Sequence, residues 1–361
     1  YKRQRYPIRM EVEKSRMKEG TEKDEKPEYE TVEEMKTVNS MVPLWQRKKS
    51  DVTEEEYNKF YSELTHEFDK PQRTITVSAE GSVTYKALLF VPSSRPFNFY
   101  TEGYEKGLQL YSAGVLIMDK CDSLLPDYLR FVRGVVDSPD LSLNISREML
   151  QHDRQLKFIA GNLEKKIKTE LQKLMDNDRE KYEKFFAAFG PQIKYGVLAD
   201  YGAKKETLQD LLLYWSSKEG KLISLKEYVA AMPEDQKYIY YANGESREAL
   251  HQLPQMEKLQ QKGCDVLFMT DEVDGFVPQT LAKYQDKELK AITADDLGLE
   301  TEEEKKAAEE KSEKSKQTLE FVKKTLGDKI KDVRLSDNLG SHPVSVVPDG
   351  GMTFEMEKYF K

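Results

Sequence analysis

The chain has 361 residues, which at roughly 150 residues per domain predicts two or three domains. Charged residues make up 34% and hydrophobic residues 38%, which indicates folded cores beneath a heavily charged surface. The 57 basic and 65 acidic residues give a net charge of −8, which argues against a compact DNA-binding protein, so we expect no nucleic-acid partner.

No apolar run approaches the roughly 18–20 residues that cross a bilayer, and no signal-peptide pattern opens the chain, so no membrane partner is expected. The two cysteines, Cys121 and Cys264, are too few for a disulfide framework, which is typical of a reducing compartment. These features predict a cytoplasmic protein. The chain starts at Tyr1 and stops at Lys361 inside a helical pattern, so we expect a piece of a longer protein.

The first 140 residues are expected to be rich in strands. Alternating apolar residues over 6–13 and 32–38 predict a hairpin, with the charged segment 14–30 as its mobile tip. A helix over 53–68 is expected to begin at a capping box formed by Thr53 and Glu56. Further elements follow in order: strands over 74–78, 83–91 and 108–118, and a strand or short helix over 127–136.

From residue 151 the apolar residues recur every three or four positions as far as Leu174, which predicts one long amphipathic helix. Shorter helices are expected over 179–190, 192–200 and 207–213. From residue 237 the pattern alternates: strands over 238–242, 265–270 and 289–293 are separated by helices over 246–262 and 274–284. This alternation predicts a small parallel sheet. A block of Glu, Lys and Ala follows a domain boundary near 294–304, and a strand is expected over 344–347.

The catalytic motifs of common enzymes are missing. The sequence contains no glycine-rich dinucleotide or P-loop motif and no G-x-S-x-G, and its four histidines are far apart, so no metal site is predicted. A nucleotide-dependent enzyme domain that uses the region 238–293 remains an alternative function, although residues 242–245 contain only one glycine. A purely structural scaffold is a third interpretation.

One segment stands out between the strands and the long helix. Asn144 and Ser146 are good helix N-cap types, and Arg147 lies where a helix N-terminus already favours an anion. An arginine there can hold a phosphate through two parallel hydrogen bonds. The alternative is a solvated arginine in the first turn, and the spacing alone favours this alternative.

Two strings in this part of the chain, F-V-R-G-V-V-D-S at 131–138 and L-N-I-S-R-E-M-L-Q at 143–151, resemble the middle segment of the 90-kDa heat-shock protein chaperones. The bacterial high-temperature protein G type is the most similar. Further matches lie at 43–45, 51–61, 89–96 and 240–246. The resemblance runs in order from Tyr6 to Phe360.

The resemblance implies a mixed α/β fold in four parts. These are a large αβα sandwich (1–175), a helical connector (176–235), a small βαβαβ unit (236–300) and the front of a C-terminal domain (301–361). Family members begin with an ATP-binding domain and end with dimerisation helices, and neither is present in these residues. The resemblance therefore implies that ATP, with Mg, is bound mainly by the absent N-terminal domain, that these residues alone form no enzyme and hold no cofactor, and that the longer protein is a homodimer.

The resemblance also implies site residues. Arg147 would contact the γ-phosphate of ATP in the neighbouring N-terminal domain, with Gln151 as its partner in the same loop. Contacts to partly folded client proteins are implied for six residues: Trp45, Phe276, Met352, Met356, Tyr359 and Phe360. From the residues themselves, Trp45 can equally pack beneath its loop, and the stripe 352, 356, 359 and 360 can be core or exposed surface. Leu116 is expected to be a strand core residue first and a client contact only weakly.

Overall fold

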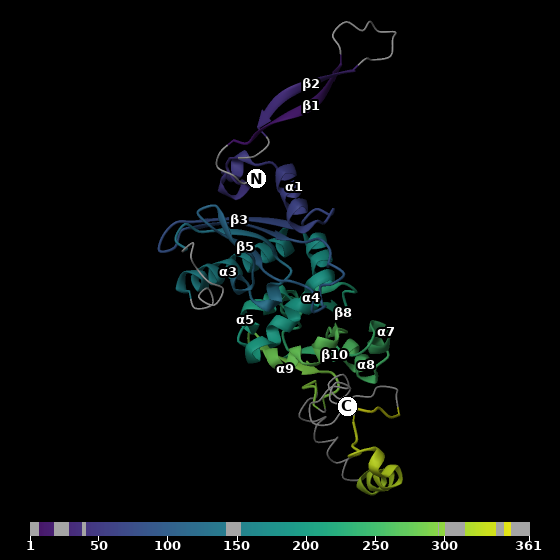
Figure 1. Ribbon diagram of the computed structural model, residues 1–361. Coiled ribbons are helices and arrows are strands. Elements are labelled where there is room, and N and C mark those ends of the chain that lie inside the picture. Colours follow the sequence, from purple (N-terminus) through teal and green to yellow (C-terminus); the bar gives the residue numbers. More distant parts are fainter. Residues whose placement is uncertain are drawn as a thin grey trace, which may run out of the picture. The chain divides into compact units, whose positions relative to one another are not determined.

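A computed structural model describes residues 7–17, 29–37, 41–141, 153–294, 296–299, 315–336 and 343–347 (Figure 1). The chain divides into two compact units. Unit 1 comprises Tyr1–Pro126 and Arg130–Ile167, and unit 2 comprises Asp127–Leu129 and Lys168–Lys361. This division differs from the four predicted parts, and each unit is described by itself.

The predicted N-terminal hairpin is confirmed. Strands β1 (Arg9–Met17) and β2 (Tyr29–Thr37) pair antiparallel, from Arg9 opposite Thr37 to Met17 opposite Tyr29. The pairing therefore continues into the charged segment that was expected to be a loop, because backbone hydrogen bonds extend a two-stranded ladder whatever the side chains. The tip of the hairpin lies outside the described residues.

Unit 1 contains a five-stranded sheet in the order β3-β4-β7-β5-β6. Its strands are β3 (Arg73–Ala79), β4 (Tyr85–Val91), β5 (Leu108–Ser112), β6 (Val115–Cys121) and β7 (Arg133–Asp137). β3 and β4 lie where they were predicted. Neighbouring strands are antiparallel except β5 and β7, which are parallel.

The single strand predicted over 108–118 is wrong, because the chain turns back at Ala113 and Gly114. Both residues have a positive φ, +47° and +82°, as in the tight turns that join hairpin strands. Alanine is uncommon in such a turn, and the single glycine Gly114 was too weak a signal to divide the predicted strand. The N–H of Gly114 donates to Asp137 Oδ1 at 3.1 Å, which helps to hold the turn.

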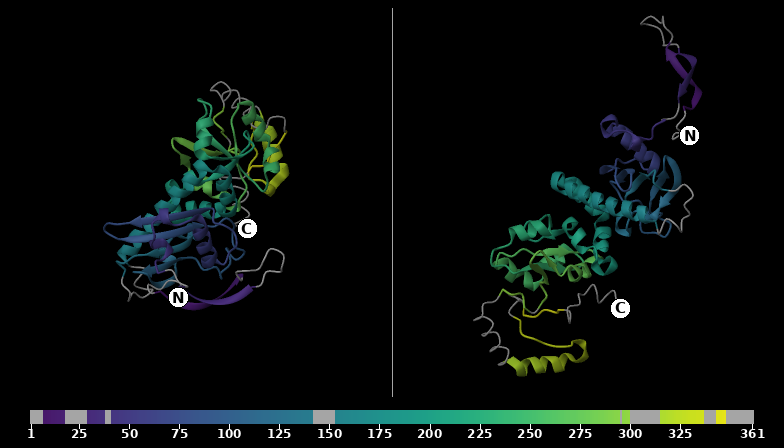
Figure 2. Two further views of the ribbon diagram at one scale, coloured as in Figure 1. Left: turned by 90° about the horizontal axis from the view of Figure 1, so that it is seen from above. Right: turned by 90° about the vertical axis from the view of Figure 1, so that its left-hand side faces the viewer.

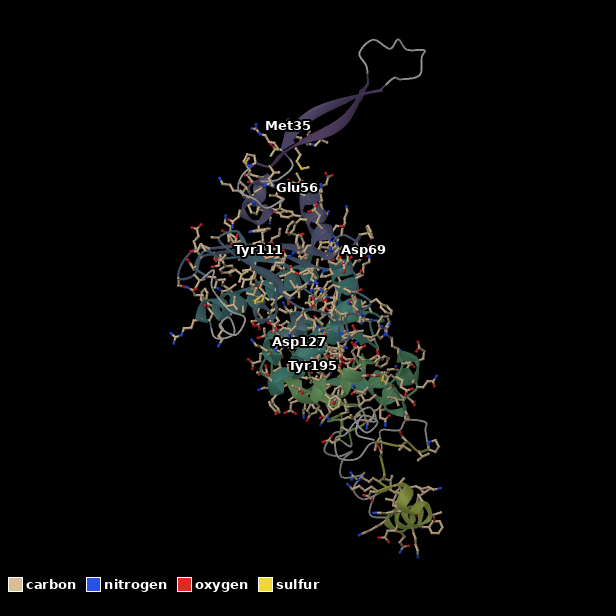
Figure 3. All side chains as sticks on the ribbon, viewed as in Figure 1. Met35, Glu56, Asp69, Tyr111, Asp127 and Tyr195 are labelled. Atoms are coloured by element: carbon tan, nitrogen blue, oxygen red, sulfur yellow. The ribbon has the colours of Figure 1, made fainter. Side chains whose placement is uncertain are left out.

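Helices cover both faces of this sheet. α1 (Glu54–Thr65) begins at the predicted Thr53–Glu56 capping box and packs its Tyr61 against Phe90 of β4 (Figure 3 labels Glu56). α3 (Arg154–Asn177) covers the other face, since its Asn162 hydrogen-bonds Tyr85, which alternates with Phe90 along β4. The predicted long helix and its αβα layering are thus confirmed. The apolar positions that predicted α3 are all buried: Leu156, Ile159, Leu163, Ile167, Leu171 and Leu174.

Unit 2 contains a six-stranded sheet in the order β12-β13-β10-β11-β8-β9. Its strands are β8 (Leu213–Ser216), β9 (Leu222–Ser224), β10 (Tyr238–Asn243), β11 (Leu267–Met269), β12 (Lys283–Tyr284) and β13 (Lys287–Ala291). β10 pairs parallel with both β11 and β13, as predicted. β8, β9 and β12 extend this core with antiparallel pairs.

The helices of unit 2 lie on both faces of its sheet (Figure 2). α7 and α8 pack on one face through Leu250, Met256 and Leu259, and α9 contacts α4 on the other. Their bounds are α4 (Arg179–Gly202), α5 (Lys205–Leu208), α6 (Leu225–Ala231), α7 (Arg247–His251), α8 (Pro254–Gln261) and α9 (Val277–Leu281). The αβα arrangement predicted for the small sheet is therefore present.

Several predicted boundaries in unit 2 are wrong. The expected helical connector over 176–235 contributes β8 and β9 to the sheet, because short strands whose partners are distant in sequence leave no periodic signal. The predicted helix over 246–262 is interrupted at Leu253, which is extended because Pro254 follows it. The helices predicted over 179–190 and 192–200 instead run on through Pro191 as one helix, α4, and helical geometry is lost only at Ala199, Asp200 and Tyr201.

The final described segments are short. Residues 315–326 are helical, and Gly327 follows with a φ of +57°, as expected for a glycine that ends a helix. The strand predicted over 344–347 is wrong, since these residues have no regular structure. Within the described part of the chain, no helix is long and apolar enough to span a membrane.

Candidate functional site

Described residues anchor both ends of the segment 142–152. On the side of β7, Ser112 Oγ donates to the carbonyl oxygen of Leu141 at 2.6 Å, and the N–H of Thr84 donates to Asp140 Oδ2 at 2.6 Å. On the side of α3, Asp153 Oδ1 accepts the N–H groups of Gln155 and Leu156 at 2.7 and 2.9 Å. Asp153 therefore caps α3.

Arg147 and Gln151 lie within this segment and outside the described residues. Asn144 and Ser146, the expected N-cap types, also lie outside the described residues, and α3 itself begins at Arg154 behind Asp153. What the described residues define is the frame of the segment: the end of β7 on one side and the start of α3 on the other.

Asp137, the last residue of β7, holds one side of this frame. Its carboxylate is buried, with 1% of the residue exposed. Oδ2 accepts hydrogen bonds from Trp45 Nε1 at 2.9 Å and Gln46 Nε2 at 2.8 Å, and Oδ1 accepts the N–H of Gly114. Hydrogen bonds to a charged acceptor are stronger than neutral ones, so Asp137 ties the loop before α1 and the β5–β6 turn to the end of β7.

Trp45 is a core residue of unit 1. It is 6% exposed, and its ring lies 4.8 Å from that of Tyr111 and 5.9 Å from that of Phe60. The implied exposed aromatic at this position is therefore wrong, and the alternative interpretation, an indole packed beneath its loop, describes the structure. The reason is the Asp137 carboxylate, which gives the indole N–H a buried partner.

Leu116 also differs from expectation. It was expected to be a core residue of its strand, but β6 lies at the edge of the sheet and Leu116 is 47% exposed, next to Val115 at 55%. The strand pattern predicted buried side chains because it did not show that β6 has a neighbour on one side only.

Phe276 is half-buried in unit 2, between the 3-10 turn η6 (Glu272–Gly275) and α9. The other implied client contacts, Met352, Met356, Tyr359 and Phe360, lie outside the described residues. Of the client candidates in the described part of the chain, Phe276 and the more weakly implied Leu116 have exposed area for a surface contact, whereas Trp45 does not.

A buried ionic cluster lies directly before Phe276. Lys194 Nζ of α4 is 2.8 Å from Asp271 Oδ2 and 2.7 Å from Asp274 Oδ2, and Lys194 and Asp274 are 4% and 0% exposed. Burial raises the pKa of the Asp274 carboxyl above its ordinary value, against the opposing effect of the Lys194 ammonium group. The sequence signal, a lysine among the apolar residues Ile193, Gly196 and Val197, was missed.

This cluster bears on the alternative enzyme function. Parallel α/β sheets bind ligands outside the carboxyl ends of their strands. In this sheet the position is occupied by Lys194, Asp271 and Asp274, which lie just beyond the end of β11. The side-chain amide of Asn243, at the end of β10, donates a hydrogen bond to the Asp274 carbonyl oxygen. Gly244 is needed for packing, because a Cβ there would lie 2.7 Å from Leu250 Cδ2. Both features leave the nucleotide interpretation without support.

Two of the cavities in the described residues bear on this question. One of about 220 Å³ lies beside the residues that precede β10 and β11, including Gln236 and Asp265, and so at the opposite ends of these strands from a typical ligand site. The other, of about 450 Å³, lies in unit 1 and is lined by Glu67, Tyr104 and Arg133 among others. Among the described residues, no group of three or more His, Cys, Asp or Glu side chains is placed to hold a metal ion.

Comparisons with known proteins agree with one family. A sequence model described as Hsp90 protein matches residues 4–361. The chain is 54% identical over 354 residues to the chaperone protein HtpG of Bacillus subtilis, covering 98% of this chain and 56% of the relative. The HtpG of Oceanobacillus iheyensis gives the same identity and coverage. The chain thus spans about half the length of the curated relatives it matches.

A solved structure agrees. The middle domain of a Plasmodium falciparum heat shock protein superposes with a TM-score of 0.62 at 28% sequence identity, over 70% of this chain and 100% of that domain. This similarity covers the α/β architecture described above.

Proposed function

The chain belongs to the Hsp90 protein family, and we propose that it is the middle segment of an ATP-dependent molecular chaperone that binds partly folded client proteins. The observation that carries this proposal is the frame around residues 142–152. The family string L-N-I-S-R-E-M-L-Q lies in the sequence between the Asp137-anchored end of β7 and the Asp153 cap of α3.

In this proposal Arg147 serves the ATPase reaction of the longer protein. ATP and Mg bind mainly in an N-terminal domain that precedes these residues, and Arg147 contacts the γ-phosphate when that domain closes on the middle segment. A guanidinium group suits this role because it stays charged and donates two parallel hydrogen bonds to a phosphate. Gln151 supports the same contact. The chain alone is then no ATPase, and its longer form acts as a cytoplasmic homodimer.

Client proteins are proposed to bind at Phe276 and at the stripe of Met352, Met356, Tyr359 and Phe360. A half-buried aromatic ring on a firmly held turn offers apolar area to a partner at little entropic cost. Methionine suits a surface that must adapt to many partners. Trp45 is not included, because its buried indole is not accessible to a client.

Binding of a permanently unfolded protein tests the client contact. Reduced and carboxymethylated α-lactalbumin is titrated against the 361-residue chain and its Phe276→Ala variant. We expect the variant to bind about tenfold more weakly, as for a central aromatic contact, and to melt at a lower temperature because the buried part of the ring is lost. Phe321→Ala in the helix 315–326 is the matched control, since Phe321 is 70% exposed.

Equal affinities of the wild-type chain and the Phe276→Ala variant would remove Phe276 from the client surface. A wild-type chain without affinity for the unfolded protein would contradict client binding by this segment.

A further inference from the structure

We propose that Lys194 is a positioning residue for Phe276, whose proposed contact with client proteins this inference deepens. The ammonium group of Lys194 fixes the turn from Asp271 to Gly275, and this turn sets the place and direction of the Phe276 ring. The inference rests on the proposed function for its biological meaning, but its geometry is independent of it.

Lys194 forms a clamp with the carboxylates of Asp271 and Asp274. Lys194 reaches both ends of η6, with Nζ 2.8 Å from the cap residue Asp271 and 2.7 Å from Asp274, the third residue of the turn. The same Asp274 oxygen accepts the N–H of Asp271 at 3.1 Å, and the Asp271 carbonyl oxygen accepts the N–H of Asp274 at 2.9 Å. One cation thus closes a ring of hydrogen bonds around the turn.

Backbone hydrogen bonds connect the clamped turn to Phe276. The N–H of Phe276 donates to the carbonyl oxygen of Val273 at 3.1 Å, inside the clamped turn. The Phe276 carbonyl oxygen accepts both the N–H and the hydroxyl group of Thr280, at 3.1 and 3.2 Å, at the start of α9. The backbone of Phe276 is therefore held on both sides, on the N-terminal side by a turn that Lys194 clamps and that Asn243 also contacts through the Asp274 carbonyl oxygen.

Lys194 lies in a firmly packed part of α4. α4 packs closely against the segment Asp127–Leu129 of the same unit, because a Cβ on Gly196 would lie 2.6 Å from the Tyr128 side chain. Gln192 Nε2 donates to the carbonyl oxygen of Asp127 at 3.2 Å. The ammonium group also lies 4.6 Å from the centre of the Tyr214 ring, a favourable cation–π distance. Lys194 therefore extends from a fixed helix.

Stability alone does not account for the buried ammonium group of Lys194. Replacing a buried ion pair by apolar residues is often neutral or stabilising, so such a pair is weak evidence for a role in stability. An ionic clamp instead selects one geometry, because two carboxylates must meet one ammonium group. This selection suits a turn that presents a binding residue.

The experiment uses the 361-residue chain with Lys194→Met and with the compensated pair Lys194→Met and Asp274→Asn. The compensated pair leaves no unpaired buried charge at Asp274, so it stays folded if the single variant does not. Lys287→Met is the matched control. Lys287 Nζ donates a hydrogen bond to the Gln236 carbonyl oxygen, which precedes β10 and so lies at the opposite end of the strands from the clamp. Amide hydrogen exchange over 271–282 is followed beside that over 238–243.

We expect exchange over 271–282 to become about tenfold faster or more in the compensated pair, with β10 unchanged, as for local opening of one segment. Unfolded α-lactalbumin should bind several-fold more weakly. In the Phe276→Ala background the same pair should cost less than about a further twofold, because residues that act through one another are not additive.

Unchanged exchange over 271–282 in a folded compensated pair would overturn the inference, and so would a full additional loss of affinity in the Phe276→Ala background. If exchange rises as expected and Phe276→Ala has no effect on client binding, the positioning stands and the proposed client contact fails. The two proposals are thus separated by different readouts.

Discussion

The Asp137 carboxylate joins parts of unit 1 that are far apart in the sequence. It accepts the Trp45 indole N–H, the Gln46 amide and the backbone N–H of Gly114, and Tyr111 stacks beside the indole (Figure 3 labels Tyr111). Each of these donors would lose its charged acceptor if Asp137 were removed. Asp137 thus adds a buried side-chain anchor to the strand pairing at the end of β7, before the segment with Arg147.

Asp137→Ala is therefore expected to destabilise unit 1 by about 3 kcal/mol, since it removes hydrogen bonds to a charge and leaves buried donors without partners. Trp45→Phe keeps most of the ring and removes one donor, so it should cost about 1–2 kcal/mol. Urea unfolding of both variants and of the double variant measures these losses. Additive losses would mean that the indole and the carboxylate do not interact.

For single residues, the sequence and the family resemblance indicated candidate functional residues but did not predict which side chains surround them. Trp45 was implied to be exposed, yet its indole partner Asp137 is distant in the chain and no local pattern relates the two. Lys194 was missed for the same reason, because Asp271 and Asp274 become its partners only through folding. Capping boxes are local, and the one at Thr53 and Glu56 was predicted correctly.

Among the elements, α4 carries the clamp lysine and begins at Asp178. The Asp178 side chain accepts the backbone N–H of Lys181, and the Lys181 ammonium group lies 3.0 Å from Asp178 Oδ2. The Lys181 side chain first, and its N–H second, hold the pKa of the Asp178 carboxyl below its ordinary value of 3.8. Because the folded-state pKa is lowered, the stabilisation is complete above pH 3.8 and is lost as the pH falls through the folded-state value.

Asp178→Ala should therefore lower the melting temperature of the chain at pH 7, and the difference from wild type should shrink as the pH falls below 3.8. Asp178→Asn is the matched control, because asparagine also caps helices and does not titrate. Scanning calorimetry at pH 7, 5 and 3 checks this. A difference between wild type and Asp178→Ala that stays constant down to pH 3 would contradict the role of the charge.

Long periodic elements were predictable and short ones were not. α3 has about six turns of unbroken apolar spacing, so local pattern and tertiary packing agree on it. The β5–β6 turn was missed because Ala113 adopts a conformation that glycine or asparagine would normally signal. β8 and β9 were missed because four and three residues are too few to show a period, and β8 pairs with β11 from a distant part of the chain.

For the whole molecule, the mixed α/β class and the parallel core of the second sheet followed from the order of the elements, because strands that alternate with helices have few ways to pack. The division into units did not follow. α3 is one continuous helix in the pattern, yet its residues up to Ile167 belong to unit 1 and its residues from Lys168 to unit 2. Contacts, which define such units, are not visible in a linear pattern.

The central claim is that this segment serves an ATP-dependent chaperone through Arg147, and ATP turnover by a full-length protein that contains the chain tests it most directly. Arg147→Ala is compared with Arg154→Ala, an exposed arginine in the first turn of α3. An arginine that contacts a transferring phosphoryl group is worth ~10³-fold, and a rate-limiting closure of the domains would hide part of this.

We therefore expect Arg147→Ala to lower the turnover number at least about tenfold, with the dissociation constant for ATP unchanged and Arg154→Ala close to wild type. Wild-type turnover in Arg147→Ala, at full occupancy with ATP, would contradict the claim.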